Sequence, residues 1–147
     1  MEGFMKIAIA SDHAGLRLKN ILKKHFAEHE FIDVGTHTED SCDYPDYALL
    51  AGEKVVSGEA EKGIVICGTG IGISIAANKV KGIRAALCFN EFMAEMSRKH
   101  NDANVLALGA RVIGEDLAVR IAEVWLKTEF EGGRHEKRVI KIGKIES

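Results

Sequence analysis

A cysteine at the head of a glycine-rich segment is the most chemically suggestive feature of this sequence. The segment is Cys67-Gly68-Thr69-Gly70-Ile71-Gly72, and it directly follows a short apolar run, residues 63–66. Glycines allow a tight turn that aims several backbone N–H groups into one concavity, and a helix beginning there adds its positive end. Such a loop binds a phosphate or a developing oxyanion, and its dipoles favour the thiolate of Cys67 as a base or nucleophile. The alternative is that Cys67 is a small apolar residue at the end of a buried strand.

The spacing of this loop separates it from better-known glycine loops. A dinucleotide loop has a third glycine where this chain has Ile73, and an acidic residue about 20 positions further on, where it has Cys88. The loop lacks the lysine of a nucleoside-triphosphate loop, and Ile73 stands where cysteine-dependent phosphatases have arginine. We therefore expect a bound phosphate or oxyanion and no nucleotide cofactor.

Two histidine-containing motifs offer groups for proton transfer. Asp12-His13 follows the first apolar run and would face the Cys67 loop, where the pair could polarise a sugar hydroxyl or hold a phosphate. The alternative is that Asp12 caps the next helix and His13 is exposed. His100 ends a helical stretch just before the fifth apolar run, either as an acid–base group or as a core histidine.

Three arginines are candidates for phosphate binding. Arg111 follows the fifth apolar run, and Arg134 and Arg138 lie four residues apart, so they project from one face of a C-terminal helix. Guanidinium groups suit a phosphate because it accepts several forked hydrogen bonds. For the C-terminal pair, the alternative is a solvated basic helix.

Five apolar runs alternate with amphipathic stretches, which predicts how these groups are positioned. The runs are 7–10, 31–34, 63–66, 83–87 and 104–108. The alternation predicts an α/β fold: a three-layer, flavodoxin-like or Rossmann-like five-stranded parallel sheet with helices on both faces. The common order is 2-1-3-4-5, and we expect one domain over residues 1–147. Ligands bind at the carboxyl ends of such strands, which brings Asp12 and the Cys67 loop together between strands 1 and 3.

The composition argues against several classes of partner. The formal net charge is −2, so no overall field attracts nucleic acid or a membrane surface. No apolar run approaches the ~20 residues of a membrane span, and the N-terminus lacks the apolar segment of a signal peptide. The three cysteines show no paired metal-ligand spacing. We expect a reduced, cytoplasmic protein without a metal site.

These groups together would suffice to isomerise an aldose phosphate to a ketose phosphate. An acid–base group opens the sugar ring, and a base removes the proton on the carbon next to the carbonyl. N–H donors stabilise the resulting enediolate before the proton returns to the neighbouring carbon. Neither a metal ion nor an organic cofactor is required.

Five motifs in order resemble those of the type B ribose-5-phosphate isomerases, and the likeness runs from about Lys6 to Ile145. They are Ser11-Asp12-His13-Ala14-Gly15, Asp43-Tyr44-Pro45-Asp46-Tyr47, the run from Ile66 to Lys79, His100-Asn101-Asp102, and Glu131-Gly132-Gly133-Arg134-His135. The resemblance implies a flavodoxin-like fold and interconversion of ribose 5-phosphate and ribulose 5-phosphate. It also implies a homodimer or homotetramer whose site is shared across a subunit interface.

The resemblance also implies a role for each matching residue. Cys67 would be the base, supported by Thr69, and His100 would assist ring opening. The enediolate would be held by Asn101 and by the backbone of Gly68, Gly70, Ile71, Gly72, Ile73 and Ser74. The sugar hydroxyls would contact Asp12 and Tyr47, and the phosphate would be bound by His13, Arg111, Arg134 and Arg138.

Two positions and three alternatives stay open at this point. One branch of the family has a glutamate base where this chain has Ile73, which leaves Cys67 as the base, and His135 matches a ring-opening position of that branch. The same fold houses isomerases of six-carbon substrates, allose 6-phosphate and galactose 6-phosphate. Outside this class, the chain could be a non-catalytic nucleotide- or phosphate-binding module of flavodoxin type. It could also be a redox or thiol-transfer protein, although it lacks a C-x-x-C motif.

Overall fold

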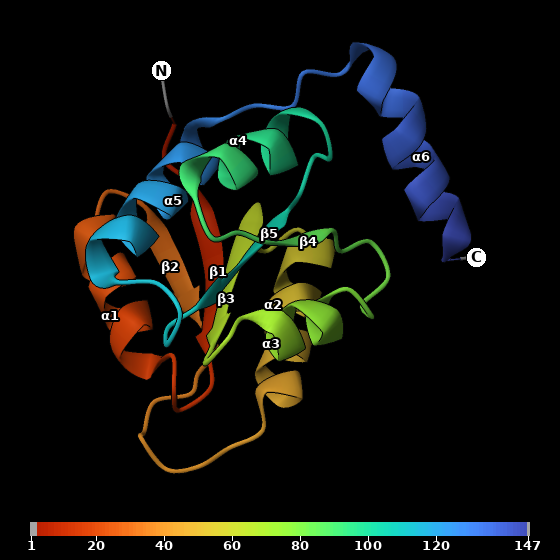
Figure 1. Cartoon of the computed structure of the whole chain (residues 1–147). Coiled ribbons are helices and arrows are strands. Elements are labelled where there is room, and N and C mark those ends of the chain that lie inside the picture. Colours follow the sequence, from red (N-terminus) through yellow and green to blue (C-terminus); the bar gives the residue numbers. More distant parts are fainter. Residues whose placement is uncertain (1–2, 147) are drawn as a thin grey trace.

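The computed structural model describes residues 3–146, which form a five-stranded sheet covered by helices on both faces (Figure 1). The strands are β1 (Lys6–Ser11), β2 (Glu30–Asp33), β3 (Lys62–Cys67), β4 (Ala85–Leu87) and β5 (Val105–Gly109). The helices are α1 (Leu16–His25), α2 (Tyr44–Val56), α3 (Ile71–Ala77), α4 (Glu91–Lys99) and α5 (Glu115–Lys127); a 3-10 turn, η1 (Gly133–His135), leads into α6 (Glu136–Ile145). All neighbouring strands are parallel, which confirms the predicted fold class.

The order of the last two strands differs from the expected one. The sheet runs β2-β1-β3-β5-β4, so that β5, and not β4, pairs with β3. All five residues of β5 are buried, whereas the three residues of β4 are only partly buried. The longer apolar strand therefore takes the interior position, and the short one takes the edge. β2 and β3 still lie on opposite sides of β1, so the point at which the strand order reverses is between β1 and β3, as expected.

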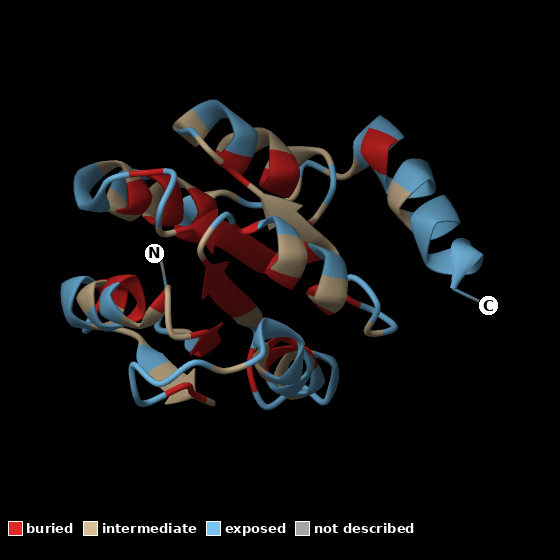
Figure 2. Ribbon diagram, turned by 60° about the horizontal axis from the view of Figure 1, so that its bottom comes forward, coloured by how far each residue is buried: buried red, intermediate tan, exposed pale blue. Residues whose placement is uncertain are grey.

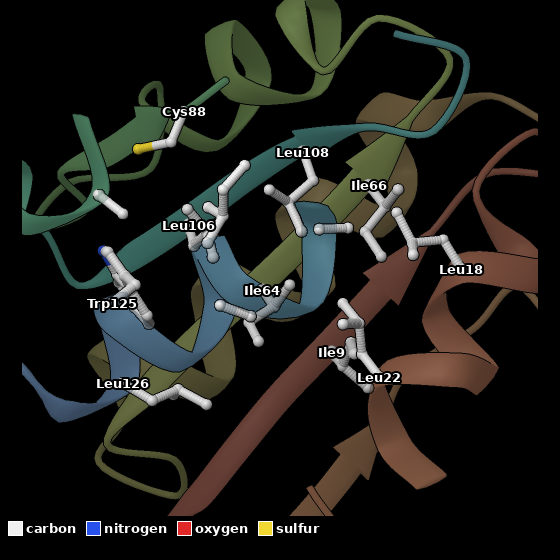
Figure 3. Packing of buried hydrophobic residues seen from close by; sticks show 14 of the residues in the cluster. Ile9, Leu18, Leu22, Ile64, Ile66, Cys88, Leu106, Leu108, Trp125 and Leu126 are labelled. Atoms are coloured by element: carbon white, nitrogen blue, oxygen red, sulfur yellow. The ribbon is translucent and has the colours of Figure 1, made fainter. Parts of the chain in front are cut away.

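The two faces of the sheet carry side chains of different size. Alternate residues of the central strands place large aliphatic groups, such as Ile9, Ile64 and Leu106, against α1 and α5, around Trp125 (Figure 3). The opposite face carries mainly alanine and valine and packs against α2 and α3. Because side chains alternate along a strand, Cys67 belongs to this second face. The interior of both layers is buried (Figure 2).

The outer edge of β4 is closed by a side chain. The Nδ2 group of Asn78, the C-terminal cap of α3, donates to the carbonyl of Ala85 at 3.0 Å, and its Oδ1 accepts from the Ala85 N–H at 2.7 Å. The Asn104 amide similarly bonds the backbone of Gly82 and Arg84 just before the strand. These bonds explain why β4 starts at Ala85 and not at Ile83, where the apolar run begins.

The C-terminal helix leaves the body of the molecule. α6 extends along one side of the sheet without packing on a neighbouring helix (Figure 1). At its end, the Glu146 carboxylate accepts the Gly82 N–H at 3.0 and 3.1 Å. Ile140, Ile142 and Ile145 of this helix are exposed. Within residues 3–146, no helix combines the length and apolar character that crossing a membrane requires.

Candidate active site

Cys67 is the last residue of β3, and its sulfur lies inside the turn that follows. The side chain retains 4% exposure. Its Sγ accepts a hydrogen bond from the Gly70 N–H at 3.2 Å, so the glycine loop curls around the sulfur. A backbone N–H pointing at a thiol stabilises negative charge on it. The arrangement therefore suits a sulfur that carries negative charge for part of a reaction.

Two close approaches hold the glycine loop against β5. Gly70 has a φ of +80°, and a Cβ there would lie 2.6 Å from Leu87 Cδ1 and 2.8 Å from the Leu108 carbonyl carbon. A Cβ on Gly109 would lie only 2.3 Å from the Thr69 carbonyl oxygen. The backbone of the loop thus rests directly on the end of β5, which leaves no space for larger residues at these two positions.

Several groups of the loop are already bonded within it. The Ile71 N–H donates to Thr69 Oγ1 at 3.2 Å, and the Ser74 hydroxyl donates to the Ile71 carbonyl at 2.8 Å. Together with the Gly70 N–H on the sulfur, two of the N–H groups expected to face a ligand are engaged in the loop. Thr69 therefore shapes the turn, and its exposed side chain lies beside it.

Asp12 and His13 lie next to this loop, as their positions after β1 predicted. The Asp12 N–H donates to the Ile66 carbonyl at 3.2 Å, one residue before Cys67. The buried Asp12 carboxylate accepts the Gly15 N–H at 3.1 Å in the turn before α1, whose N-cap residue is Gly15 and not Asp12. His13 Nδ1 accepts the Cys42 N–H at 3.2 Å. The half-buried imidazole is therefore fixed by the loop that follows β2.

Arg111, Tyr47 and Ile73 lie at the same end of the sheet. The Arg111 N–H donates to the Gly68 carbonyl at 2.9 Å, and its Nη1 would lie 3.4 Å from a Cβ on Gly68, so the guanidinium lies over the loop. Tyr47 packs on Gly35, where a Cβ would lie 2.8 Å from its Cε1. Ile73 is fully buried, so only its backbone borders the loop.

The remaining candidates form a second group around His100 and His135. The two imidazole rings are stacked, with centroids 4.1 Å apart and planes inclined by 14°. His135 is 6% exposed, and its Nε2 has no hydrogen-bond partner among the described residues, with Glu131 Oε1 at 3.5 Å. Burial lowers the pKa of His135, and the neighbouring His100 and Arg134 lower it further, which favours the neutral imidazole.

Asn101, Arg134 and Arg138 belong to this second group. Asn101 lines a groove of about 500 Å³ between α6 and the segment before β4. Arg134 lies in η1 and Arg138 in α6, and both are exposed. Both therefore belong to the C-terminal segment that leaves the body of the molecule.

The two groups lie at opposite ends of the strands: the Cys67 group at the carboxyl ends and the His100 group at the amino ends. Ser11, Cys67 and Gly109 end their strands, whereas His100 precedes β5. The two ends of β3 are separated by the four residue steps from Gly63 to Cys67, a distance of roughly 13 Å at the usual rise of a strand. A single chain therefore does not bring His100, Asn101, Arg134 or Arg138 to Cys67.

The other two cysteines are placed differently from Cys67. Burial raises the pKa of Cys88 to about 11, so this thiol stays protonated at neutral pH. Cys42 is half-buried, with its sulfur 3.9 Å from His13 Nδ1. Of the cysteines, Cys67 alone is followed by the glycine turn.

Two contacts at these edges have no signal in the sequence. A Cβ on Gly72 would lie 2.6 Å from Tyr44 Cζ, so the Tyr44 ring covers the glycine loop. The stacking of His135 on His100 joins residues 35 positions apart. Tyr44 belongs to the same motif as Tyr47, and only the packing of α2 on α3 shows which ring meets the loop.

The fold and the Cys67 loop together define a class of protein. It is a Rossmann-like α/β protein with a thiol and a glycine-rich loop at the point where the strand order of its sheet reverses. The model of the ribose/galactose isomerase family matches residues 7–142. A ribose-5-phosphate isomerase B of Escherichia coli is 50% identical over 143 residues, which are 96% of each chain. The chain therefore belongs to the ribose/galactose isomerase family and, within it, to the type B ribose-5-phosphate isomerases, as the motifs indicated.

Solved structures agree with this assignment. Ribose-5-phosphate isomerase B of Clostridium thermocellum superposes with a TM-score of 0.95, at 61% identity and with 97% of each chain covered. Ribose-5-phosphate isomerase B of Mycoplasma genitalium, solved with bound ribulose-5-phosphate, has a TM-score of 0.92 at 44% identity, covering 96% of this chain and 95% of its own.

Proposed function

We propose that this chain interconverts ribose 5-phosphate and ribulose 5-phosphate through an enediolate, with Cys67 as the base. The observation that supports this most directly is the position of the Cys67 sulfur, inside an N–H-bearing turn and one residue from the backbone contact with Asp12. Family membership and the relative solved with ribulose-5-phosphate support the choice of substrate.

The residues at the carboxyl edge would bind the open-chain sugar. Arg111 and His13 would contact the phosphate, while Asp12 and Tyr47 would contact the sugar hydroxyls. The Arg111 guanidinium that lies over Gly68 supports this assignment, because a forked cation beside the loop can bind the phosphate.

The proposed chemistry moves one proton between adjacent carbons. The Cys67 thiolate takes the proton from C2, and the electrons of that C–H bond form a C1–C2 double bond while the carbonyl electrons move to O1. The thiol then returns the proton to C1, and the O2 hydroxyl proton passes to O1, which leaves the ketone at C2. N–H donors of the loop would stabilise the enediolate, each by about 3 kcal/mol in the transition state. Ile73 cannot accept a proton, so the base must be another residue.

We further propose that a second copy of the chain completes the site. Four of the expected site residues lie at the other end of the strands from Cys67: His100, Asn101, Arg134 and Arg138. Of these, His100 would assist ring opening. The exposed arginines and the apolar residues of α6 support a homodimer or homotetramer in which these groups act on the partner's substrate. His135, stacked on His100, is an equally placed candidate for ring opening.

The decisive test is conversion of ribose 5-phosphate in the presence of a chelator, with wild type beside Cys67→Ser. We expect the variant to lose at least about 100-fold in kcat, the lower range of general-base effects, while it still binds the sugar phosphate. The matched control is Cys88→Ala, which removes a thiol from the core and should keep kcat within a few-fold. Full activity of folded Cys67→Ser would remove Cys67 from the reaction.

Turnover on different sugars tests the substrate. The family's description covers both ribose and galactose isomerases, so ribose 5-phosphate should be compared with allose 6-phosphate and galactose 6-phosphate. We expect the highest kcat/KM for the five-carbon substrate. A binding module would bind sugar phosphate without turnover, and a thiol-transfer protein would lose Cys67 to iodoacetamide without protection by sugar phosphate.

A further inference from the structure

We propose that His100, Glu131 and His135 form a binding site for a divalent transition metal of the zinc class. The donor atoms of the three side chains all lie within 4.8 Å of one another, and they are the one such group of three among residues 3–146. Two imidazoles and one carboxylate, with a fourth position open to water, are a frequent zinc ligand set. This part of the inference does not depend on the proposed function.

An unpartnered nitrogen supports the site independently of the ligand count. Only 6% of the His135 surface is exposed, yet its Nε2 lacks a hydrogen-bond partner in the described structure. A buried polar atom without a partner is costly, and in native proteins it commonly marks a missing ligand or water. The nearest acceptor, Glu131 Oε1, lies 3.5 Å away, which is too long for a good hydrogen bond.

The geometry needs little adjustment to accept the ion. In a tetrahedral site with metal–ligand bonds of about 2.1 Å, donor atoms lie roughly 3.4 Å apart. His135 and Glu131 already have this separation, at 3.5 Å. The wider distances within the group, up to 4.8 Å, would close if the half-buried His100 ring rotated out of its stack.

The site would not be found by its spacing in the sequence. Glu131 and His135 lie four apart around η1, but His100 comes from the end of α4, 31 residues before Glu131. The Glu131 N–H donates to the Lys99 carbonyl at 3.1 Å, and this bond holds the two segments together. The absence of cysteine pairs therefore does not exclude a metal.

Occupancy would have a consequence for catalysis, and this part rests on the proposed function. An imidazole that donates its lone pair to a metal cannot accept a proton. If His100 or His135 opens the sugar ring, zinc at this site would inhibit isomerisation. Occupancy of the site could then be measured in two independent ways, by the amount of bound metal and by the loss of isomerase activity.

The experiment titrates Zn²⁺ into the intact protein against a chromophoric chelator, without substrate. Wild type should bind one Zn²⁺ per chain, and Glu131→Gln should weaken binding by about tenfold or more, as does even the loss of an outer-shell partner in such sites. Glu95→Gln is the matched control, because this exposed carboxylate of α4 pairs with Lys99 and lies outside the group. The control should bind like wild type. Equal affinity in wild type and Glu131→Gln, or no binding at all, would overturn the site.

A second measurement separates this inference from the proposed function. In the isomerase assay, the zinc concentration that halves activity should rise about tenfold or more in Glu131→Gln, with little change in activity without zinc. An unchanged midpoint would mean that zinc acts elsewhere, for example on Cys67, and would contradict the inhibitory role. Zinc binding by a chain that shows no turnover would uphold the metal site and reject the isomerase.

Discussion

At the scale of single residues, the position of the Cys67 sulfur depends on backbone contacts that exclude side chains. The loop that donates to the sulfur rests on the end of β5, and the Thr69 carbonyl passes within 2.3 Å of where a Gly109 Cβ would be. The loop is therefore held by strand packing as well as by its own hydrogen bonds. Its geometry should respond to changes in β5 that leave every candidate site residue untouched.

Gly109→Ala tests this dependence. Because the obstructing atoms belong to the backbone, either the loop or the strand must shift, and we expect a loss of about 1–3 kcal/mol in the free energy of unfolding. Activity should fall with it, since the sulfur and its N–H donor move apart. Urea denaturation and kcat/KM measure the two effects. Gly114→Ala, where nothing lies within 4 Å of the added Cβ, is the control and should change both much less.

Single residues also show how far sequence reasoning reached. Cys67, the glycine loop, Asp12 and His13 were expected at one edge, and the structure places them there. Their proximity follows from parallel strands whose carboxyl ends share an edge. The covering of Gly72 by Tyr44 and the stacking of His100 on His135 depend on how separate helices pack, and no local pattern encodes that.

At the scale of elements, a buried ion pair ties α1 to β2. Lys19 is fully buried, and its Nζ donates to Asp33 Oδ1 at 2.7 Å and to the Thr36 carbonyl. Lys23 Nζ donates to the second Asp33 oxygen at 2.8 Å. Burial alone would raise the pKa of Asp33, but the hydrogen bonds from the two lysines outweigh it and hold the pKa below its ordinary value.

This pair makes stability depend on pH in the acid range. Because the folded-state pKa of Asp33 is below the unfolded value of about 3.9, the pair stabilises the protein fully above that pH and less as pH falls through the folded pKa. Asp33→Asn leaves the buried Lys19 ammonium without its anion, so we expect a loss of about 3 kcal/mol at pH 7. Urea denaturation between pH 7 and pH 3 should show the difference from wild type shrinking at the acid end.

A control and a contrary outcome follow from the surface ion pairs. Glu59→Gln removes the exposed partner of Lys54 and should have little effect on stability at pH 7. If Asp33→Asn were as stable as Glu59→Gln, the buried pair would not hold α1 to β2.

The order of the strands shows the limit of elementwise prediction. Both apolar runs, 83–87 and 104–108, were expected as strands, and their order followed a common template. The side chains of Asn78 and Asn104 instead bind the backbone at the start of the first run, which shortens β4. These are contacts between distant polar residues, so hydrophobic periodicity alone gave the fold class but not the interior neighbour of β3.

At the scale of the whole molecule, α6 has no residue buried against the rest of the chain. Its isoleucines are exposed by 43–82%, which indicates a partner surface, and its basic residues lie beside them. An apolar helix face of this kind is stabilised when a second chain covers it. The second chain that we propose is another copy of the same protein.

Ile140→Asn tests the role of α6 in assembly. Replacing an exposed isoleucine that the second copy would cover with a polar residue should shift dimers or tetramers towards monomers, with loss of turnover and an unchanged far-UV spectrum. Size-exclusion chromatography with light scattering measures the mass. Lys141→Asn introduces the same residue next to it and should leave the assembly intact. A wild type that is monomeric at micromolar concentration would contradict the proposal.

Mixing inactive variants tests whether the site is shared. If Cys67 and Arg134 of different chains meet in one site, dimers made from Cys67→Ala and Arg134→Ala chains contain one intact site in each mixed dimer. Random pairing at equal amounts then restores about 25% of wild-type activity, because half of the dimers are mixed and each has one working site.

The control for this experiment uses two residues of the same edge. Cys67→Ala mixed with Arg111→Ala should restore nothing, since both residues would belong to one chain's half of the site. No recovery in the first mixture would place Arg134 in the same chain's site as Cys67. Recovery in the second mixture would instead place Arg111 in the half of the site that the other chain supplies.

The Asn78 amide on the outer backbone of β4 has a consequence for how the protein behaves in a crowded solution. An exposed edge strand is a template on which further strands add, and this is a common start of aggregation and fibre growth. With both outward groups of Ala85 occupied by one side chain, a further strand cannot pair with the first residue of β4. The sheet is thereby protected from open-ended growth at this edge, while the helices remain available for finite, symmetric association.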